Sequence, residues 1–210
     1  MPRQRTLTRD RVVRAALELT DRDGIDALSM RTLGRALGVE AMALYTHVRN
    51  KADLLDAVAV EILGELDLAF DSTRPWQERI RRVALAWAGL QERHPRSFVL
   101  VYRTGLRSEA VERVTEELLD ALRVAGFDES GAALAYQTII VFVDGALIGR
   151  SSWADDDLQN AWARIAATAD PVRYPRYAEV APHAASLTWT QILDSGLSLL
   201  LDGLRARLRT

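Results

Sequence analysis

The sequence contains no cysteine. This absence excludes structural disulfides, thiolate metal ligands and a cysteine nucleophile. Histidine is also scarce, since only His47, His94 and His183 are present and they lie far apart along the chain. The sequence has neither a glycine-rich phosphate-binding loop nor an HExxH metal motif. The residue combinations that usually carry catalysis are therefore missing, and we expect neither an enzyme nor a cofactor or metal site.

No unbroken apolar run approaches the roughly 20 residues that cross a bilayer. The segment Met1–Thr6 lacks the apolar core of a signal peptide. We therefore expect a soluble, cytoplasmic protein with no membrane partner. A length of 210 residues is enough for one large domain or two modest ones.

Basic and acidic residues are distributed unevenly. Residues 1–51 include ten basic and six acidic side chains, a net charge of +4, whereas residues 52–210 have a net charge of −6. A basic N-terminal quarter on an acidic body suggests that this end meets a polyanion. A chance imbalance of a few charges explains the same numbers equally well.

Apolar residues recur at helical spacing along nearly the whole chain, and no segment reads as a sheet. The fourth expected helix begins at Asn50, with Asp53 placed to complete a capping box. Three prolines, Pro171, Pro175 and Pro182, predict an irregular stretch. The sequence therefore predicts an all-α fold with helices at about 8–22, 29–37, 41–47, 50–63, 76–93, 96–103, 109–125, 130–153, 156–169 and 186–208.

The segment Ser29–Val48 has the spacing of a helix-turn-helix. Two short helices can cross closely only where the contact residue is small and the turn is glycine. Gly34 supplies the small contact and Gly38 the turn, while a shared core is expected from Leu33, Leu37, Val39 and Leu44. Other helical hairpins can place glycines in the same way, so this pattern alone is only moderately specific.

The residues that follow are more specific. Leu44–Lys51 reads LYTHVRNK and is followed by ADLL. This stretch closely resembles the recognition helix and the start of the next helix in the tetracycline repressor family, and the resemblance extends from about Thr8 to Leu63. It implies a homodimeric transcriptional regulator, usually a repressor, that a small molecule releases from double-stranded operator DNA. It also implies a helix-turn-helix domain at residues 1–50, a connecting helix at 51–70, and a ligand-binding and dimerisation domain at 71–210.

The resemblance implies a DNA role for individual residues. Tyr45 and His47 are expected to contact the operator backbone and nearby base edges, and Thr46 to face the groove. Lys51 is expected to bind a phosphate at a helix start. Arg31 matches an arginine that reads guanine, in keeping with the bidentate geometry of that pair. Two alternatives stay open: Tyr45 packs against the first helix, and Arg31 is a solvated surface charge.

The groove-facing segment departs from the family pattern. Ala41, Met42 and Ala43 stand where polar side chains are expected, and they offer only apolar contacts such as those with thymine methyl groups. We therefore expect base readout to depend on Arg31, apolar thymine contacts and DNA shape.

The late helices predict a dimer interface. The last helix has two adjacent apolar stripes, which are too wide for a helix that covers only its own core. Glycines in the two long late helices would let a partner backbone come close, although a monomer can also bury such stripes internally. Two helix-turn-helix units about 34–36 Å apart would read a two-fold symmetric site. The expected interface residues are Gly145, Gly149, Ile192, Leu193, Gly196, Leu197, Leu200 and Leu204.

An effector site is expected where aromatic and apolar bulk gathers in the C-terminal part, which suits a hydrophobic or aromatic compound. Gln137 and Asp144 interrupt an apolar helix on one face and need polar partners; these are either the ligand or a dimer contact. His94 is interpreted as a structural histidine. A DNA-binding regulator without an effector remains the alternative function. The expected ligand-lining residues are Trp87, Phe98, Tyr102, Tyr136, Gln137, Ile140 and Asp144.

Overall fold

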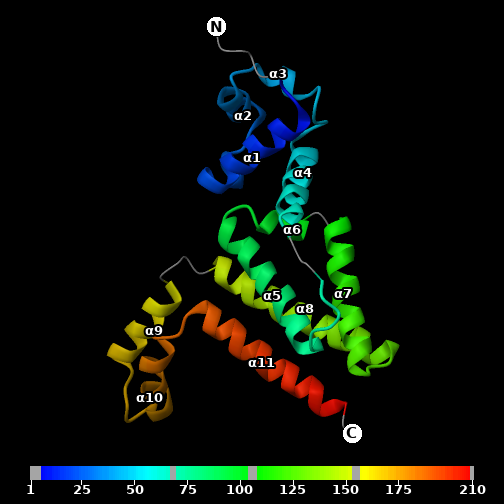
Figure 1. Ribbon diagram of the computed structural model, residues 1–210. Coiled ribbons are helices and arrows are strands. Elements are labelled where there is room, and N and C mark those ends of the chain that lie inside the picture. The colour runs from blue at the N-terminus through cyan, green and yellow to red at the C-terminus, as the bar shows by residue number, and fades with distance from the viewer. Residues whose placement is uncertain (1–5, 67–69, 104–107, 153–156, 209–210) are drawn as a thin grey trace. The chain divides into compact units, whose positions relative to one another are not determined.

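A computed structural model of the protein describes residues 6–66, 70–103, 108–152 and 157–208. Every described element is helical, which confirms the expected all-α fold. Figure 1 labels the helices. In chain order they are α1 (Arg9–Asp23), a single 3₁₀ turn (Ile25–Ala27), α2 (Met30–Leu37), α3 (Ala41–Leu44), α4 (Lys51–Gly64), α5 (Trp76–Arg93), α6 (Val99–Arg103), α7 (Glu109–Ala125), α8 (Glu129–Ser152), α9 (Asp157–Thr168), α10 (Pro175–Ala184) and α11 (Trp189–Arg207).

The N-terminal helices begin at side-chain caps. The Thr8 hydroxyl accepts a hydrogen bond from the Arg11 N–H, and the Ser29 hydroxyl accepts one from the Thr32 N–H. The Thr32 hydroxyl accepts in turn from the Ser29 N–H, which completes a reciprocal capping box. These caps satisfy backbone donors that have no partner within their own helix.

The expected capping box at Asn50 is only half formed. The Asn50 side chain accepts from the Asp53 N–H at 2.9 Å, as predicted. The Asp53 carboxylate does not return to Asn50, because it accepts instead from the Arg49 N–H at 2.8 Å.

The expected irregular stretch contains α10, so that prediction was wrong. Pro175 is the first residue of this helix, where a missing N–H costs nothing because no intrahelical acceptor is available. Pro182 lies inside α10, two residues before its last residue, Ala184. Smaller differences occur elsewhere: α3 ends at Leu44 rather than His47, α6 begins at Val99 rather than Arg96, and α11 begins at Trp189 rather than Ser186. The expected end at Trp153 and start at Asp156 lie outside the described residues.

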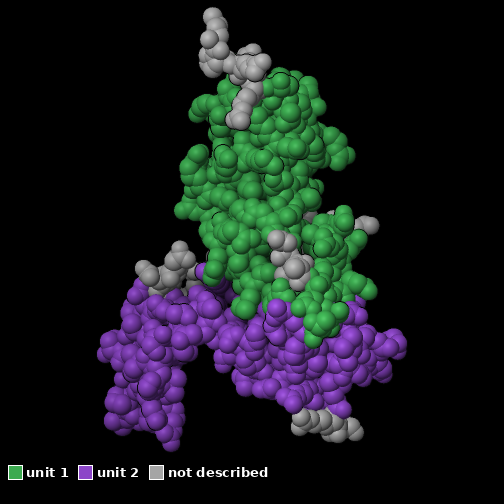
Figure 2. All heavy atoms as spheres, viewed as in Figure 1, with its two compact units in different colours: residues 1–73, 82–118 green, residues 74–81, 119–210 purple. Residues whose placement is uncertain are grey.

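The chain forms two compact units, which Figure 2 shows in different colours. The first unit comprises residues 1–73 and 82–118, and the second comprises residues 74–81 and 119–210. In the first unit α4 packs against both α1 and α6. In the second unit α11 packs against α8, and α9 against α10. The predicted domain boundaries at residues 50 and 70 do not coincide with these units and remain a prediction.

Candidate DNA-binding head and effector cavity

The crossing of α2 and α3 requires two glycines. A Cβ atom on Gly34 would lie 2.8 Å from the Val39 carbonyl oxygen, closer than real Cβ atoms come, and 3.3 Å from the Ala41 nitrogen, a tight contact. Gly38 has a φ of 69°, a left-handed conformation that glycine adopts without strain. Leu33 and Leu44 are completely buried beside this turn. The helix-turn-helix geometry expected from the sequence is therefore present.

The helix-turn-helix unit, from α1 to the start of α4, is called the head below. The side chains predicted to contact DNA lie on its outer surface. Met42 is 75% exposed and Tyr45 is 46% exposed. Arg31, Thr46 and Lys51 are also exposed, whereas Ala41 and His47 are half-buried. Tyr45 is therefore accessible to a partner, in contrast to the alternative that it is mainly a packing residue. The Thr46 hydroxyl donates to the Ala43 carbonyl at 2.7 Å.

An arginine that was not predicted from the sequence holds the end of the recognition segment, by which we mean residues 41–47. Arg9, the first residue of α1, donates from Nη1 to the His47 carbonyl at 2.7 Å. The same nitrogen lies 3.5 Å from the Asp53 carboxylate. Arg9 thus links α1 to the residues that end the recognition segment and begin α4. Because its partners are 38 and 44 residues away, no local motif points to this role.

Asp53 is the centre of this link. The Arg49 N–H donates to its carboxylate and lowers its pKa below the ordinary value, which outweighs the opposing effect of burial, and the side chains of Arg49 and Arg9 lower it further. A carboxylate in the first turn of α4 is also favoured by the positive end of the helix dipole. Asp53 therefore fixes the start of α4, which carries Lys51.

A buried histidine joins three helix ends within the same unit. His94, just after α5, has its Nδ1 2.8 Å from the Asp21 carboxylate at the end of α1, and its Nε2 3.1 Å from the Glu65 carboxylate at the end of α4. Arg93 also donates to Glu65, at 3.0 Å. Burial raises the pKa of Glu65, but the hydrogen bonds from His94 and Arg93 outweigh it and leave this pKa below its ordinary value. His94 therefore has the structural role expected, as the bridge between the head and the helices that follow it.

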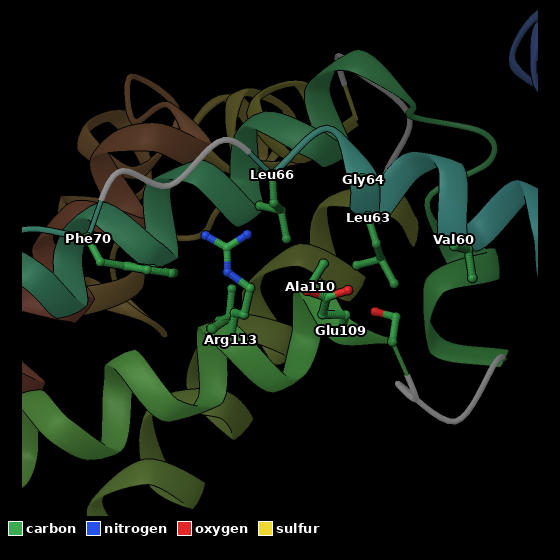
Figure 3. A pocket seen from close by; sticks show the side chains of 10 residues that line it. Val60, Leu63, Gly64, Leu66, Phe70, Glu109, Ala110 and Arg113 are labelled. Atoms are coloured by element: carbon green, nitrogen blue, oxygen red, sulfur yellow. The ribbon is translucent and has the colours of Figure 1, made fainter.

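A cavity of about 300 Å³ lies between the end of α4 and the start of α7, within the first unit. Figure 3 shows the Arg113 side chain reaching from α7 toward Leu66 and Phe70. The Arg113 guanidinium carbon lies 5.5 Å from the centre of the Phe70 ring, a distance typical of cation–π contacts. We call this space the α4–α7 cavity; its lining residues are Val60, Leu63, Gly64, Leu66, Phe70, Ser108, Glu109, Ala110, Arg113 and Val114.

None of the seven predicted ligand residues lines the α4–α7 cavity. Phe98 is fully buried, and its ring makes edge-to-face contacts with Trp87 and Tyr102 at centroid distances of 6.0 and 5.6 Å. These three rings therefore pack against one another. On α8, Tyr136, Ile140 and Asp144 are half-buried and Gln137 is exposed. Phe70 and Arg113, which line the cavity, are not among the residues predicted from the sequence.

Several residues predicted for the dimer interface are occupied within their own subunit. Leu193, Leu197 and Leu204 are buried, while Ile192 and Leu200 are half-buried. A Cβ on Gly196 would collide with the Phe142 ring, and one on Gly149 would meet the Trp189 ring at 3.3 Å. These two glycines therefore admit aromatic rings of the same chain, not a partner backbone.

Other residues of the same helices remain uncovered. A Cβ on Gly145 or on Gly203 would meet nothing within 4 Å. Leu199 of α11 is 74% exposed, and on α8 Leu134, Val141 and Ile148 are all at least half exposed. The three α8 residues are seven positions apart and so lie on one face of that helix. We call these four side chains the apolar stripe.

Comparison with known proteins agrees with this architecture. Residues 12–58 match the family model of bacterial regulatory proteins of the tetR family, and residues 71–208 match the tetracyclin repressor-like C-terminal domain. The chain therefore belongs to the TetR family of DNA-binding helix-turn-helix transcriptional regulators.

Among individual relatives, the tetracycline repressor protein class A from transposon 1721 of Escherichia coli is 31% identical over 209 residues, which cover 93% of this chain and 89% of the repressor. The Streptomyces coelicolor TetR family protein ActR, solved with actinorhodin, is 25% identical with a TM-score of 0.80 and coverage of 97% and 99%. BioQ, solved with its double-stranded DNA operator, is 28% identical with a TM-score of 0.67 and coverage of 96% and 99%. This likeness confirms the family resemblance inferred from the sequence.

Proposed function

We propose that this protein is a cytoplasmic repressor that binds a two-fold symmetric operator as a homodimer and releases it when a small hydrophobic or aromatic effector binds. The observation that carries the DNA-binding part is the head itself. Its glycine crossing and its Arg9–Asp53 link hold the recognition segment in place, while Met42, Tyr45 and Lys51 remain exposed. BioQ with its operator and ActR with actinorhodin are relatives of similar fold that support a DNA partner and an effector.

The recognition surface favours apolar readout. Met42 is the most exposed side chain of α3, and Ala41 and Ala43 beside it offer only methyl groups. The Thr46 hydroxyl proton is already donated to a backbone carbonyl. Hydrogen-bond readout is therefore assigned to Arg31, and Met42 is assigned to thymine methyl groups.

The apolar stripe supports the homodimer. Isolated exposed apolar residues are ordinary, but here four large aliphatic side chains are exposed on two helices that pack against each other, and three of them share one face of α8. The segment Glu129–Arg150 of α8 is long and apolar enough to cross a membrane by length and composition alone, and only 28% of its most apolar window is buried. A second copy of the chain covers such a one-sided stripe, since α8 packs its other face on α11 of its own subunit.

Selection of bound fragments from random DNA tests this proposal. We expect recovery of a two-fold symmetric site, and recovery of random fragments contradicts the operator assignment. Arg31→Ala is expected to relax the preference at one base pair of each half-site, where a mismatch costs about 1–3 kcal/mol. Lys51→Gln is expected to weaken binding to all DNA sequences. The slope of log K against log salt concentration should become shallower by about 1 for each lysine lost. If Arg31→Ala weakens every sequence equally, Arg31 is a phosphate contact.

A further inference from the structure

The α4–α7 cavity contains a cation without an acidic partner. Among the residues that the structure describes, Arg113 makes no ion pair, and its guanidinium lies over the Phe70 ring. Glu109 stands four residues earlier on α7, at the spacing that normally gives a helical ion pair. Figure 3 shows the Arg113 guanidinium directed away from Glu109, toward Leu66 and Phe70. The guanidinium therefore keeps its N–H donors available at the cavity.

Apart from Arg113, Glu109 and Ser108, the lining residues are apolar. Val60 is 50% exposed and Phe70 is 37% exposed, and the buried Leu63 and Val114 form part of the wall. The Ser108 hydroxyl accepts from the Val111 N–H at 3.3 Å, which leaves its own proton for another acceptor. A volume near 300 Å³ is at the lower end of the range for small-molecule sites. One fixed cation among apolar walls suits a small ligand with one acidic group and a flat apolar body.

We propose that the α4–α7 cavity is the effector site and that its ligand is an aromatic carboxylate. The carboxylate accepts two parallel hydrogen bonds from the Arg113 guanidinium, a geometry that lysine cannot reproduce. The aromatic body lies against Leu63, Val114 and the Phe70 ring. Glu109 repels a carboxylate placed at its end of the cavity, so the charge orients the ligand. This inference rests on the proposed function, because it names the chemistry of the effector that the repressor answers to.

The cavity wall also connects to the operator-binding head. Val60, Leu63 and Gly64 belong to the last part of α4, the helix that begins at Lys51. Glu65, the next residue, bonds His94, which in turn bonds Asp21 of α1. A ligand that changes the position of the end of α4 therefore acts on both helices that hold the recognition segment. Its effect on operator affinity is limited to its difference in affinity between the two states.

Binding of naphthoate and anthracene carboxylate, each compared with its neutral primary amide, tests this site. The readouts are the calorimetric Kd and the melting temperature of the full chain. We expect each carboxylate to bind more tightly than its amide and to raise the melting temperature. Arg113→Gln is expected to weaken carboxylate binding roughly ten- to a hundredfold, the range for a hydrogen bond to a charged group, and to weaken amide binding much less, because a neutral carbonyl accepts a weaker hydrogen bond from the guanidinium. Arg113→Lys should recover only part of the loss. Arg164→Gln, which removes an exposed arginine from α9, is the matched control and should bind as the wild type does.

Equal binding of acid and amide at millimolar concentration, or wild-type binding by Arg113→Gln, overturns the proposal. Operator affinity measured on the same samples distinguishes failure of the carboxylate site from failure of the proposed repressor function. Carboxylate binding that depends on Arg113 but leaves operator affinity unchanged supports the cavity and contradicts ligand control of DNA binding. Intact operator binding with no preference for the acids overturns the aromatic-carboxylate site and leaves the proposed repressor in place.

Discussion

The head and the α8–α11 region differ in the kind of side chain that each leaves exposed. In the head, the caps, the glycine crossing and the Arg9–Asp53 link are all completed within about 60 consecutive residues, so the exposed side chains are free to meet a partner. In α11 the leucines at 193, 197, 201 and 204 are buried, but Leu199 between them is 74% exposed. The comparison teaches that the head completes its packing within one chain and leaves its recognition side chains exposed, whereas α8 and α11 leave large aliphatic side chains exposed, which the proposed second copy would cover.

The largest expected effect is the weakening of the proposed dimer. Val141→Asp or Leu199→Asp would place a carboxylate in the apolar stripe. Burying one large aliphatic side chain is worth about 1.5–3 kcal/mol, and a two-fold interface contains each residue twice. Dimerisation should therefore weaken by about 3 kcal/mol or more, roughly a hundredfold. Sedimentation across a concentration series measures the change.

Val172→Asp is the control for this experiment, because Val172 is 91% exposed in the turn before α10 and lies outside the stripe. It should leave the association unchanged. If Leu199→Asp and Val141→Asp both sediment as the wild type does, the apolar stripe is not the dimer interface.

A smaller effect is expected at the crossing of α2 and α3. Gly34→Ala forces a methyl group against the Val39 carbonyl, and such overpacking costs about 1–3 kcal/mol. Operator binding should fall with it, because α3 must move to relieve the contact. Urea unfolding and a filter-binding assay measure the two losses.

Gly89→Ala, inside α5, is the matched substitution. Its Cβ would lie 3.5 Å from an Arg93 side-chain nitrogen, an ordinary contact, and alanine is the better helix former by up to about 1 kcal/mol. We expect neutral or increased stability. Equal destabilisation by the two substitutions would show that the crossing is not specially close.

The smallest expected effect is a pH dependence at the start of α4. The folded pKa of Asp53 lies below its ordinary value, so its ionised form stabilises the fold at pH above the unfolded value of about 3.9. This stability is lost as the pH falls through the folded pKa. The stability difference between wild type and Asp53→Asn, about 1 kcal/mol or less at pH 7, should therefore shrink in acid. Asp56→Asn, a neighbouring exposed carboxylate of α4, is the control. If the stability difference between wild type and Asp53→Asn instead grew in acid, the assigned lowering of the Asp53 pKa would be wrong.

The parts of the fold that were predictable from the sequence are those fixed by neighbours. Gly34 and Gly38 act on residues within seven positions of themselves, so the helix-turn-helix could be located and the side chains that it exposes could be named. The α10 helix was missed because the prolines were interpreted as helix breakers, although one of them stands at a helix start.

The parts that were not predictable depend on residues far apart in the chain. Gly196 is small because Phe142 lies over it, and this pairing, 54 positions apart, has no periodic signature. The same is true of the contact between Phe70 and Arg113. Helical spacing showed that α11 has two apolar stripes. It could not show which of them packs inward, because that choice depends on the shape of α8.

The single lysine of this chain has a practical consequence. Lys51 is exposed at the first position of α4, next to the recognition segment, and the other 26 basic residues are arginines. Apart from the terminal amine, an amine-selective dye or acylating reagent therefore has one target side chain in the protein, and it lies where DNA is proposed to bind. Bound operator should shield that amine from modification, so the extent of labelling can report occupancy directly, without a cysteine having to be introduced.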